Sequence, residues 1–115
     1  MSEKRVLVID DDPDVLESLG ILVTEIGYAV ETAVSGAEAL GKLEQAEFDL
    51  ILTDFQMPGM DGAQVATAVK KLRPRMPVVL VSGRSFDSNY SNVSASLKKP
   101  FTLSELRNVL AACLP

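Results

Sequence analysis

The best candidates for chemistry in this chain are polar residues that each follow a short apolar run. Asp10 and Asp11 follow the first such run, and Asp54, Ser82 and Lys99 each stand at or just after the end of a later one. Taken singly, an aspartate before a proline is typical of a helix cap, and Ser-Gly or Lys-Pro pairs are typical of turns. The informative feature is their shared position, because independent surface residues would seldom all occupy it.

Gathered together, these side chains favour one kind of chemistry. Unit charges 4 Å apart interact by about 4 kcal/mol at an effective dielectric of 20, so clustered carboxylates need a counter-charge. An all-oxygen cluster suits a hard divalent ion, Mg²⁺ or Mn²⁺, and Lys99 offers a second positive charge. Carboxylate, cation, hydroxyl and ammonium are the groups needed to accept and hold a phosphoryl group. The sequence therefore predicts phosphoryl transfer.

The composition excludes several other classes. The chain has 115 residues, no histidine, one cysteine and a net charge of −5. The length predicts one domain over residues 1–115, and the missing imidazole excludes Ser-His-Asp and Cys-His catalysis. Cys113 cannot form an internal disulfide, which favours a reducing compartment. The acidic balance predicts no nucleic-acid partner, and the short apolar runs predict no membrane span, so we expect a cytoplasmic protein.

Strand-like and helix-like segments alternate along the chain, which predicts an α/β domain. Strands are expected at 5–9, 28–33, 48–53, 78–81 and, weakly, 95–98. Helices are expected over 13–26, from a capping box at 35–38, around 65–72, and from a second capping box at 102–105. This alternation predicts a doubly wound parallel sheet with helices on both faces. Ligands bind such sheets beyond the carboxyl ends of the strands, where the polar residues above should converge.

Four segments of this chain resemble the receiver (response-regulator, CheY-like) domains of two-component signal transduction. They are Val-Leu-Val-Ile-Asp-Asp-Asp-Pro at 6–13, Asp-Leu-Ile-Leu-Thr-Asp-Phe-Gln-Met-Pro-Gly-Met-Asp-Gly at 49–62, Val-Val-Leu-Val-Ser-Gly at 78–83, and Leu-Lys-Lys-Pro-Phe at 97–101. The resemblance extends over essentially the whole chain. It implies a five-stranded parallel sheet in the order 2-1-3-4-5 and a phosphorylation-dependent switch that acts in a phosphorelay.

The resemblance also implies roles for the acidic residues. Asp54 would accept a phosphoryl group from a phosphohistidine of a histidine kinase or a histidine phosphotransfer protein. Asp11 and Asp54 would bind Mg²⁺ directly, the backbone carbonyl of Gln56 would be a further ligand, and Asp10 would act through water. The absence of histidine fits this reading, because the donor imidazole belongs to another molecule.

The resemblance also implies that Ser82 and Lys99 take part in switching. Ser82 would bind the phosphoryl oxygens, Lys99 would pair with them, and the Lys99–Pro100 bond would be cis. The domain could catalyse its own phosphorylation and dephosphorylation, and it would switch the surface that binds an unknown downstream protein.

The chain departs from the family pattern between Ser82 and Lys99. This interval is several residues short and has no helical periodicity, so we expect the fourth helix of the family to be shortened, distorted or absent. Ser96 stands where the family usually has an aromatic residue, which the usual rotamer switch requires. Gln56 and Arg84 are each two residues beyond a site residue and could tune the lifetime of the acyl phosphate.

Two other functions are compatible with parts of this pattern. A receiver-like scaffold that is never phosphorylated would keep the fold, but all the acids, the hydroxyl and the lysine are present here. A haloacid-dehalogenase-like phosphatase would use the Asp10 and Asp12 pair after the first strand, but such enzymes are generally larger and carry a cap. Metal binding and turnover of a phosphate ester are the measurements that separate these alternatives.

Overall fold

The computed structural model describes residues 3–83 and 92–114. Within them, five strands and four helices alternate along the chain as far as the fourth strand, after which the fifth strand and the fourth helix follow. The strands are β1 (Arg5–Ile9), β2 (Ala29–Ala33), β3 (Leu50–Asp54), β4 (Val78–Ser82) and β5 (Ala95–Lys98). The helices are α1 (Pro13–Ile26), α2 (Gly36–Gln45), α3 (Gly62–Leu72) and α4 (Leu103–Cys113). This order confirms the predicted α/β class.

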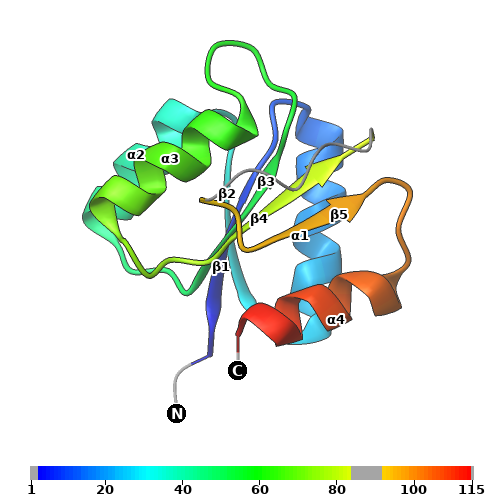
Figure 1. Ribbon diagram of the computed structural model, residues 1–115. Helices are drawn as coiled ribbons and strands as arrows, with labels where there is room; N and C mark the ends of the chain where they lie inside the picture. The colour runs from blue at the N-terminus through cyan, green and yellow to red at the C-terminus, as the bar shows by residue number, and fades with distance from the viewer. Residues whose placement is uncertain (1–2, 84–91, 115) are drawn as a thin grey trace.

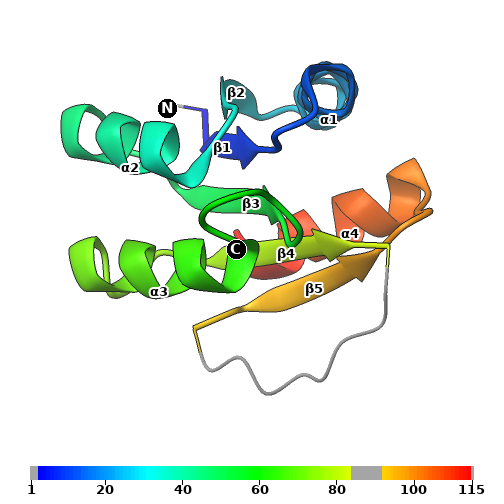
Figure 2. The same ribbon diagram turned by 90° about the horizontal axis from the view of Figure 1, so that it is seen from above.

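The five strands form one parallel sheet in the order β2-β1-β3-β4-β5, as the resemblance implied. Helices α2 and α3 cover one face of the sheet, and α1 and α4 cover the other (Figures 1 and 2). Because both faces are covered, β1, β3 and β4 are almost wholly buried and read as continuous apolar runs.

The sheet divides the hydrophobic core into two halves. One half packs Leu7 and Ile9 of β1 against α2 and α3, and the other packs Val6 and Val8 against α1 and α4. Successive strand residues point to opposite faces, so each central strand contributes to both halves. The strands are therefore held rigidly, and their carboxyl ends lie together at one edge, the upper edge in Figure 1.

Helix α1 begins and ends where the sequence predicts. The Asp12 side chain accepts hydrogen bonds from the backbone N–H groups of Asp14 and Val15, and Pro13 occupies the first helical position. Gly27 ends the helix at φ 120°, a left-handed conformation that glycine adopts without a steric cost.

The two predicted capping boxes differ in the structure. At the start of α4, Thr102 and Glu105 each accept a hydrogen bond from the other's backbone, which completes the box. At the start of α2, Ser35 accepts from the backbone of Glu38, but the Glu38 carboxylate lies 3.8 Å from Lys42 instead. Half of that box therefore forms, because a lysine one turn further along the helix competes for the carboxylate.

Strand β3 begins two residues later than predicted. The Asp49 carboxylate accepts a hydrogen bond from the backbone N–H of Arg5 at 2.7 Å, so a side chain replaces a backbone carbonyl at this point. The interval with the expected shortened fourth helix, residues 84–95, lies largely outside the described residues. Among the described residues, no helix has both the length and the continuous apolar character needed to cross a bilayer.

Candidate metal centre

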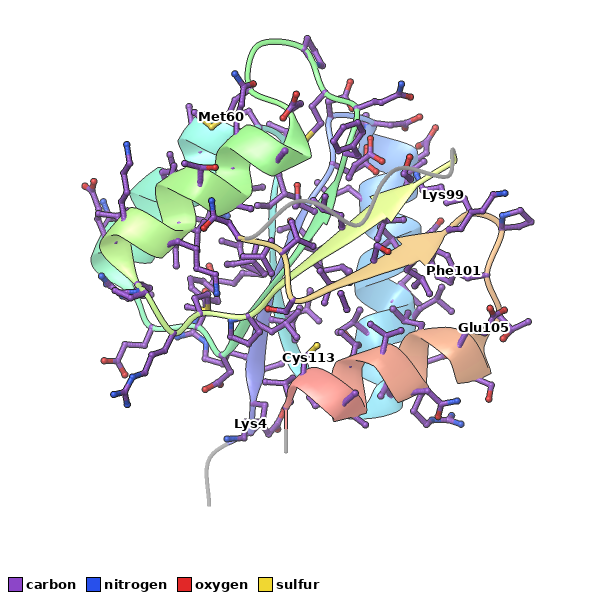
Figure 3. All side chains as sticks on the ribbon, in the orientation of Figure 1. Lys4, Met60, Lys99, Phe101, Glu105 and Cys113 are labelled. Carbon is purple, nitrogen blue, oxygen red and sulfur yellow. The ribbon has the colours of Figure 1, made fainter. Side chains whose placement is uncertain are left out.

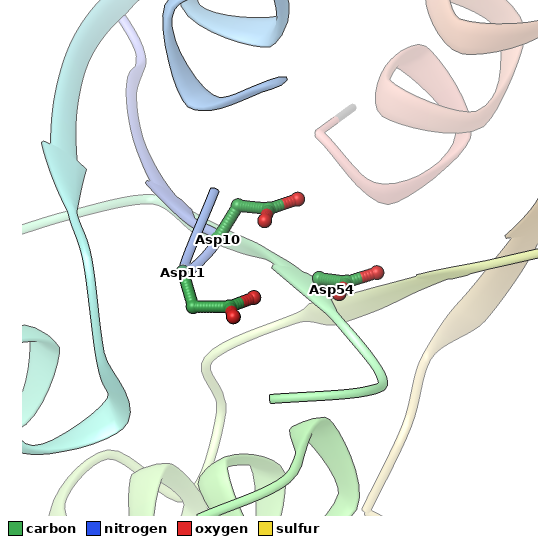
Figure 4. Close-up of side chains that lie close together, drawn as sticks. All are labelled: Asp10, Asp11 and Asp54. Atoms are coloured by element: carbon green, nitrogen blue, oxygen red, sulfur yellow. The ribbon is translucent and has the colours of Figure 1, made fainter. Parts of the chain in front are cut away.

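Three carboxylates meet at the carboxyl edge of the sheet. Asp10, Asp11 and Asp54 each place an oxygen within 4.8 Å of the others, and their side chains lie side by side in Figure 4. Asp10 is 2 % exposed and Asp54 is partly buried, whereas Asp11 faces solvent. The predicted convergence of these three residues is therefore what the structure shows.

The strand register brings these residues together. β1 and β3 are neighbours in the sheet, and Ile9 is aligned with Thr53. Asp10 directly follows the first residue of this pair, and Asp54 directly follows the second. Residues 44 positions apart thus meet because two buried apolar strands pair in one register, which a shift of one residue would destroy.

The bonding of Asp10 indicates a cation site. Its Oδ1 atom accepts a hydrogen bond from the backbone N–H of Asp12 at 2.9 Å, whereas its Oδ2 atom is buried and has no hydrogen-bond partner. A buried carboxylate oxygen without a hydrogen-bond partner is costly, and a directly bound cation would remove that cost. Three carboxylates with no imidazole or thiol among them match the oxygen ligands that Mg²⁺ prefers. The residues present therefore fit a hard divalent ion.

Lys99 supplies a fixed positive charge to this cluster. Its Nζ atom lies 3.4 Å from Asp54 Oδ1 and 3.9 Å from Asp10 Oδ2. The lysine follows β5 at the same edge of the sheet (Figure 3), and its backbone N–H donates to the Ser82 carbonyl at 2.7 Å. The Lys99–Pro100 peptide bond is cis, as expected.

Burial and mutual repulsion make two of these carboxylates harder to ionise. Desolvation is the largest cause that raises the pKa of Asp10, and the neighbouring charges of Asp54 and Asp11 raise it further. The pKa of Asp54 is also raised, mainly by desolvation, although Lys99 opposes this shift. A group that adds positive charge to the cluster would therefore favour the ionised form of both carboxylates.

Helix α3 begins against the backbone of Asp54 and Phe55, at Gly62, whose role sequence reasoning missed. Gly62 donates its backbone N–H to the Phe55 carbonyl at 2.8 Å. A Cβ atom at position 62 would lie 2.6 Å from the Asp54 carbonyl oxygen, closer than real contacts allow. The signal in the sequence was the glycine that follows Asp61. Asp61 and Gln64 also form a capping box at the start of α3, which sequence reasoning missed as well.

The remaining predicted residues differ in where they lie. Ser82 is the last residue of β4 and is 2 % exposed, whereas Gln56 is exposed in the loop after β3. Ser96 is exposed in the middle of β5, aligned with Leu80 of β4. Arg84 lies outside the described residues.

Comparisons with known proteins agree with this geometry. The family model described as "Response regulator receiver domain" matches residues 6–111. The transcriptional regulatory protein PrrA of Mycobacterium leprae is 41% identical over 111 residues, which cover 92% of this chain and 48% of PrrA. GlrR of Escherichia coli is 43% identical over 84 residues, 71% of this chain and 19% of GlrR. The chain thus spans about half the length of PrrA and less of GlrR.

Solved structures share the fold over nearly their whole length. The response regulator TrrA of Thermotoga maritima, solved in complex with Mg(2+)-BeF, has a TM-score of 0.90 and 32% identity, covering 96% of this chain and 99% of TrrA. The complex of the histidine kinase ThkA with TrrA matches through a chain with a TM-score of 0.88 and 32% identity, with 97% and 99% covered. The fold, the acidic cluster and these matches agree, and the chain belongs to the response regulator receiver domain family.

Proposed function

We propose that Asp54 is the phosphoacceptor of this receiver domain and that its donor is a phosphohistidine of a histidine kinase or a histidine phosphotransfer protein. The observation that carries this proposal is the setting of the Asp54 carboxylate. It lies within 4.8 Å of two other carboxylates and 3.4 Å from an ammonium group, at the sheet edge where ligands of this fold bind. Asp10 also lies near these groups, 3.9 Å from the Lys99 ammonium, but it is only 2 % exposed and one of its oxygens accepts from the Asp12 backbone, so Asp54 is the more accessible of the two.

The transfer step has simple chemistry. A carboxylate oxygen of Asp54 attacks phosphorus, an O–P bond forms, and the P–N bond to the donor imidazole breaks. The imidazole leaves with the electron pair and takes up a proton, so the donor histidine becomes neutral. The switch returns to its unphosphorylated state by hydrolysis, in which water attacks phosphorus and releases inorganic phosphate from the acyl phosphate. We assign the acceleration of both steps to this chain's own residues.

Mg²⁺ fits this proposal, with Mn²⁺ as a substitute. Asp11 and Asp54 would hold the ion directly with the backbone carbonyl of Gln56, and Asp10 would act through water. When bound, the ion neutralises charge on the phosphoryl oxygens and on the carboxylates. The chain's own contribution is to hold these oxygens together on two buried strands, so that they need little reorganisation.

Lys99 and Ser82 would respond to the new phosphoryl group. Phosphorylation adds negative charge and strong acceptor oxygens beside the Lys99 ammonium, which already lies 3.4 Å from Asp54. The Ser82 hydroxyl, at the end of the neighbouring strand, would donate to one of these oxygens. Gln56 and Arg84 would tune the access of water, and the exposed Ser96 cannot supply an inward-turning aromatic ring.

A groove beside Lys99 would receive the phosphohistidine partner. Residues of α1, from Asp14 to Leu22, line it on one side, and Lys99, Pro100 and Phe101 line it on the other. Its walls are largely apolar, and Lys99 joins it to the acceptor carboxylate. An apolar helix face docked here would bring a partner's imidazole to the same sheet edge as Asp54.

The experiment that tests this proposal uses acetyl phosphate with Mg²⁺ and measures the intact mass of the protein. The wild type should gain one phosphoryl group, and the Asp54→Asn variant should gain none. Asp14→Asn is a matched control, because it removes an exposed carboxylate outside the cluster. Phosphorylation of Asp54→Asn would contradict the assignment, and a wild type that is never modified by any phosphodonor would favour the scaffold reading.

A further inference from the structure

A groove of about 480 Å³ lies at the opposite edge of the sheet from the acidic cluster. It is lined by Phe48 and Asp49, just before β3, and by residues 72–77, which connect α3 to β4. In Figure 1 this connection lies at the lower left, far from the loop that follows β3. The groove takes no part in the proposed phosphoryl chemistry.

The groove lies at the end of the most basic segment of the chain. Four of the six residues from Lys70 to Arg75 are basic, in a chain with a net charge of −5. In the described part of the chain, none of these four side chains forms an ion pair with a carboxylate. Uncompensated positive charge in an acidic protein calls for a physical explanation.

Two of the four basic residues hold the groove in shape. Lys70 donates its ammonium to the Met76 carbonyl, and Arg73 donates to the Leu43 carbonyl at 2.9 Å and to the Leu72 carbonyl at 3.0 Å. These bonds join the ends of α2 and α3 to the segment that enters β4. The groove is therefore preorganised, which lowers the entropic cost of binding.

The other two basic residues, Lys71 and Arg75, are exposed, and the described structure gives neither of them a hydrogen bond or an ion pair. Between them Leu72 is 38% exposed, one of only three large hydrophobic residues exposed to that degree among the described residues. The acidic residue of the groove, Asp49, accepts a hydrogen bond from the Arg5 backbone at 2.7 Å and forms no ion pair with either cation in the described structure. The surface thus offers two unpaired cations around one apolar contact.

We propose that this groove docks an acidic peptide segment of a partner protein. Carboxylates of the segment would pair with Lys71 and Arg75, and an apolar side chain would cover Leu72. A peptide fits better than a nucleic acid, because the basic area is short and the rest of the chain would repel an extended polyanion. This docking does not depend on Asp54, so it goes beyond the proposed function.

A synthetic peptide in which glutamates surround a central Leu-Phe pair is a suitable probe. Its binding to the isotope-labelled protein can be followed through the amide chemical shifts in NMR. We expect saturable shifts in residues 47–49 and 70–77, and a dissociation constant that rises as salt is added. The Lys71→Glu, Arg75→Glu double variant should bind at least about tenfold more weakly.

Matched controls separate this proposal from general charge effects. Lys98→Glu with Arg107→Glu reverses two exposed charges on other elements and should leave the affinity unchanged, as should Asp54→Asn, which removes the proposed acceptor. A peptide with glutamine in place of glutamate should not bind. The proposal is overturned if the double variant binds as the wild type does, if no shifts saturate, or if a single-stranded oligonucleotide binds the same residues more tightly.

Discussion

The two edges of the sheet carry opposite charge and are built in opposite ways. At the carboxyl edge, Asp10, Asp54 and Lys99 come from distant parts of the chain, and both carboxylates lie within 3.9 Å of the lysine nitrogen. At the opposite edge, where the amino ends of the strands lie, the positive charge comes from one continuous segment, Lys70 to Arg75. In the described structure, Lys70 and Arg73 of this segment donate hydrogen bonds to backbone carbonyls.

This difference separates two uses of charge. The carboxylates are crowded and partly buried, so they alter one another's pKa and are suited to chemistry. At the amino edge, Lys71 and Arg75 are exposed on the surface, which suits recognition rather than catalysis. Equivalent substitutions at the two edges should therefore have different consequences.

A lysine-to-alanine substitution at each edge should give the largest difference. Lys99→Ala removes the counter-charge beside Asp54, so we expect phosphorylation by acetyl phosphate to slow by about 100-fold. Lys70→Ala removes a hydrogen bond to the Met76 carbonyl and should lower the free energy of unfolding by about 1 kcal/mol, with the phosphorylation rate unchanged. Rates from intact mass and stabilities from urea unfolding provide the two readouts.

Equal phosphorylation rates in these two variants would remove the distinction between the edges. A large loss of stability in Lys99→Ala, measured together with a normal rate per folded molecule, would show that this lysine is structural.

Two glycines test how closely the carboxyl edge is packed. A Cβ atom at Gly62 would meet the backbone of Asp54 and Phe55, whereas one at Gly36 would meet the side chains of Met60 and Val65, 2.8 Å away. Gly62→Ala should therefore cost about 2–3 kcal/mol of unfolding free energy and slow phosphorylation, while Gly36→Ala should cost about 1 kcal/mol. Similar costs and unchanged phosphorylation in both variants would contradict the close approach of α3 to the Asp54 backbone.

The pH dependence of stability should show the smallest effect. The pKa of Asp10 and of Asp54 is raised above 3.8, so in metal-free protein the folded state holds these protons to higher pH than the unfolded state. The stability that they contribute is full below this value and is lost as pH rises through the folded pKa values. Asp54→Asn should recover on the order of 1 kcal/mol at neutral pH, because it removes one of the crowded charges.

Urea unfolding from about pH 4 to about pH 8, without metal, measures this effect. The difference in unfolding free energy between Asp54→Asn and the wild type should grow with pH. A constant difference would mean that repulsion around Asp54 is unimportant, and added Mg²⁺ should shrink the difference by stabilising the wild type.

Much of the fold and of the acidic cluster could be predicted from local features of the sequence. The residues that begin and end helix α1, Asp12, Pro13 and Gly27, can be recognised in the sequence, and the bounds of the helix agree with the prediction. The convergence of Asp10, Asp54 and Lys99 follows from a general rule, because each stands at the carboxyl end of a parallel strand. Predictions of this kind do not depend on which side chains are in contact in the folded protein.

Contacts between distant elements could not be predicted in this way. The start of β3 shifts because the Asp49 carboxylate bonds to Arg5, a residue 44 positions away. The need for glycine at position 62 arises from the approach of α3 to the Asp54 backbone, which the loop length alone does not reveal. The basic segment at 70–75 was missed by the sequence analysis, which considered only the acidic net charge, and its groove became evident only in the fold.

The most direct test of Asp54 as the phosphoacceptor is to locate the phosphoryl group chemically. Borohydride reduces an aspartyl phosphate to homoserine, so wild-type protein treated with acetyl phosphate and Mg²⁺, then reduced and digested, can be read by tandem mass spectrometry. We predict homoserine at position 54 and unmodified aspartate at positions 10 and 11. Homoserine at either of those positions, with intact aspartate at position 54, would contradict the account.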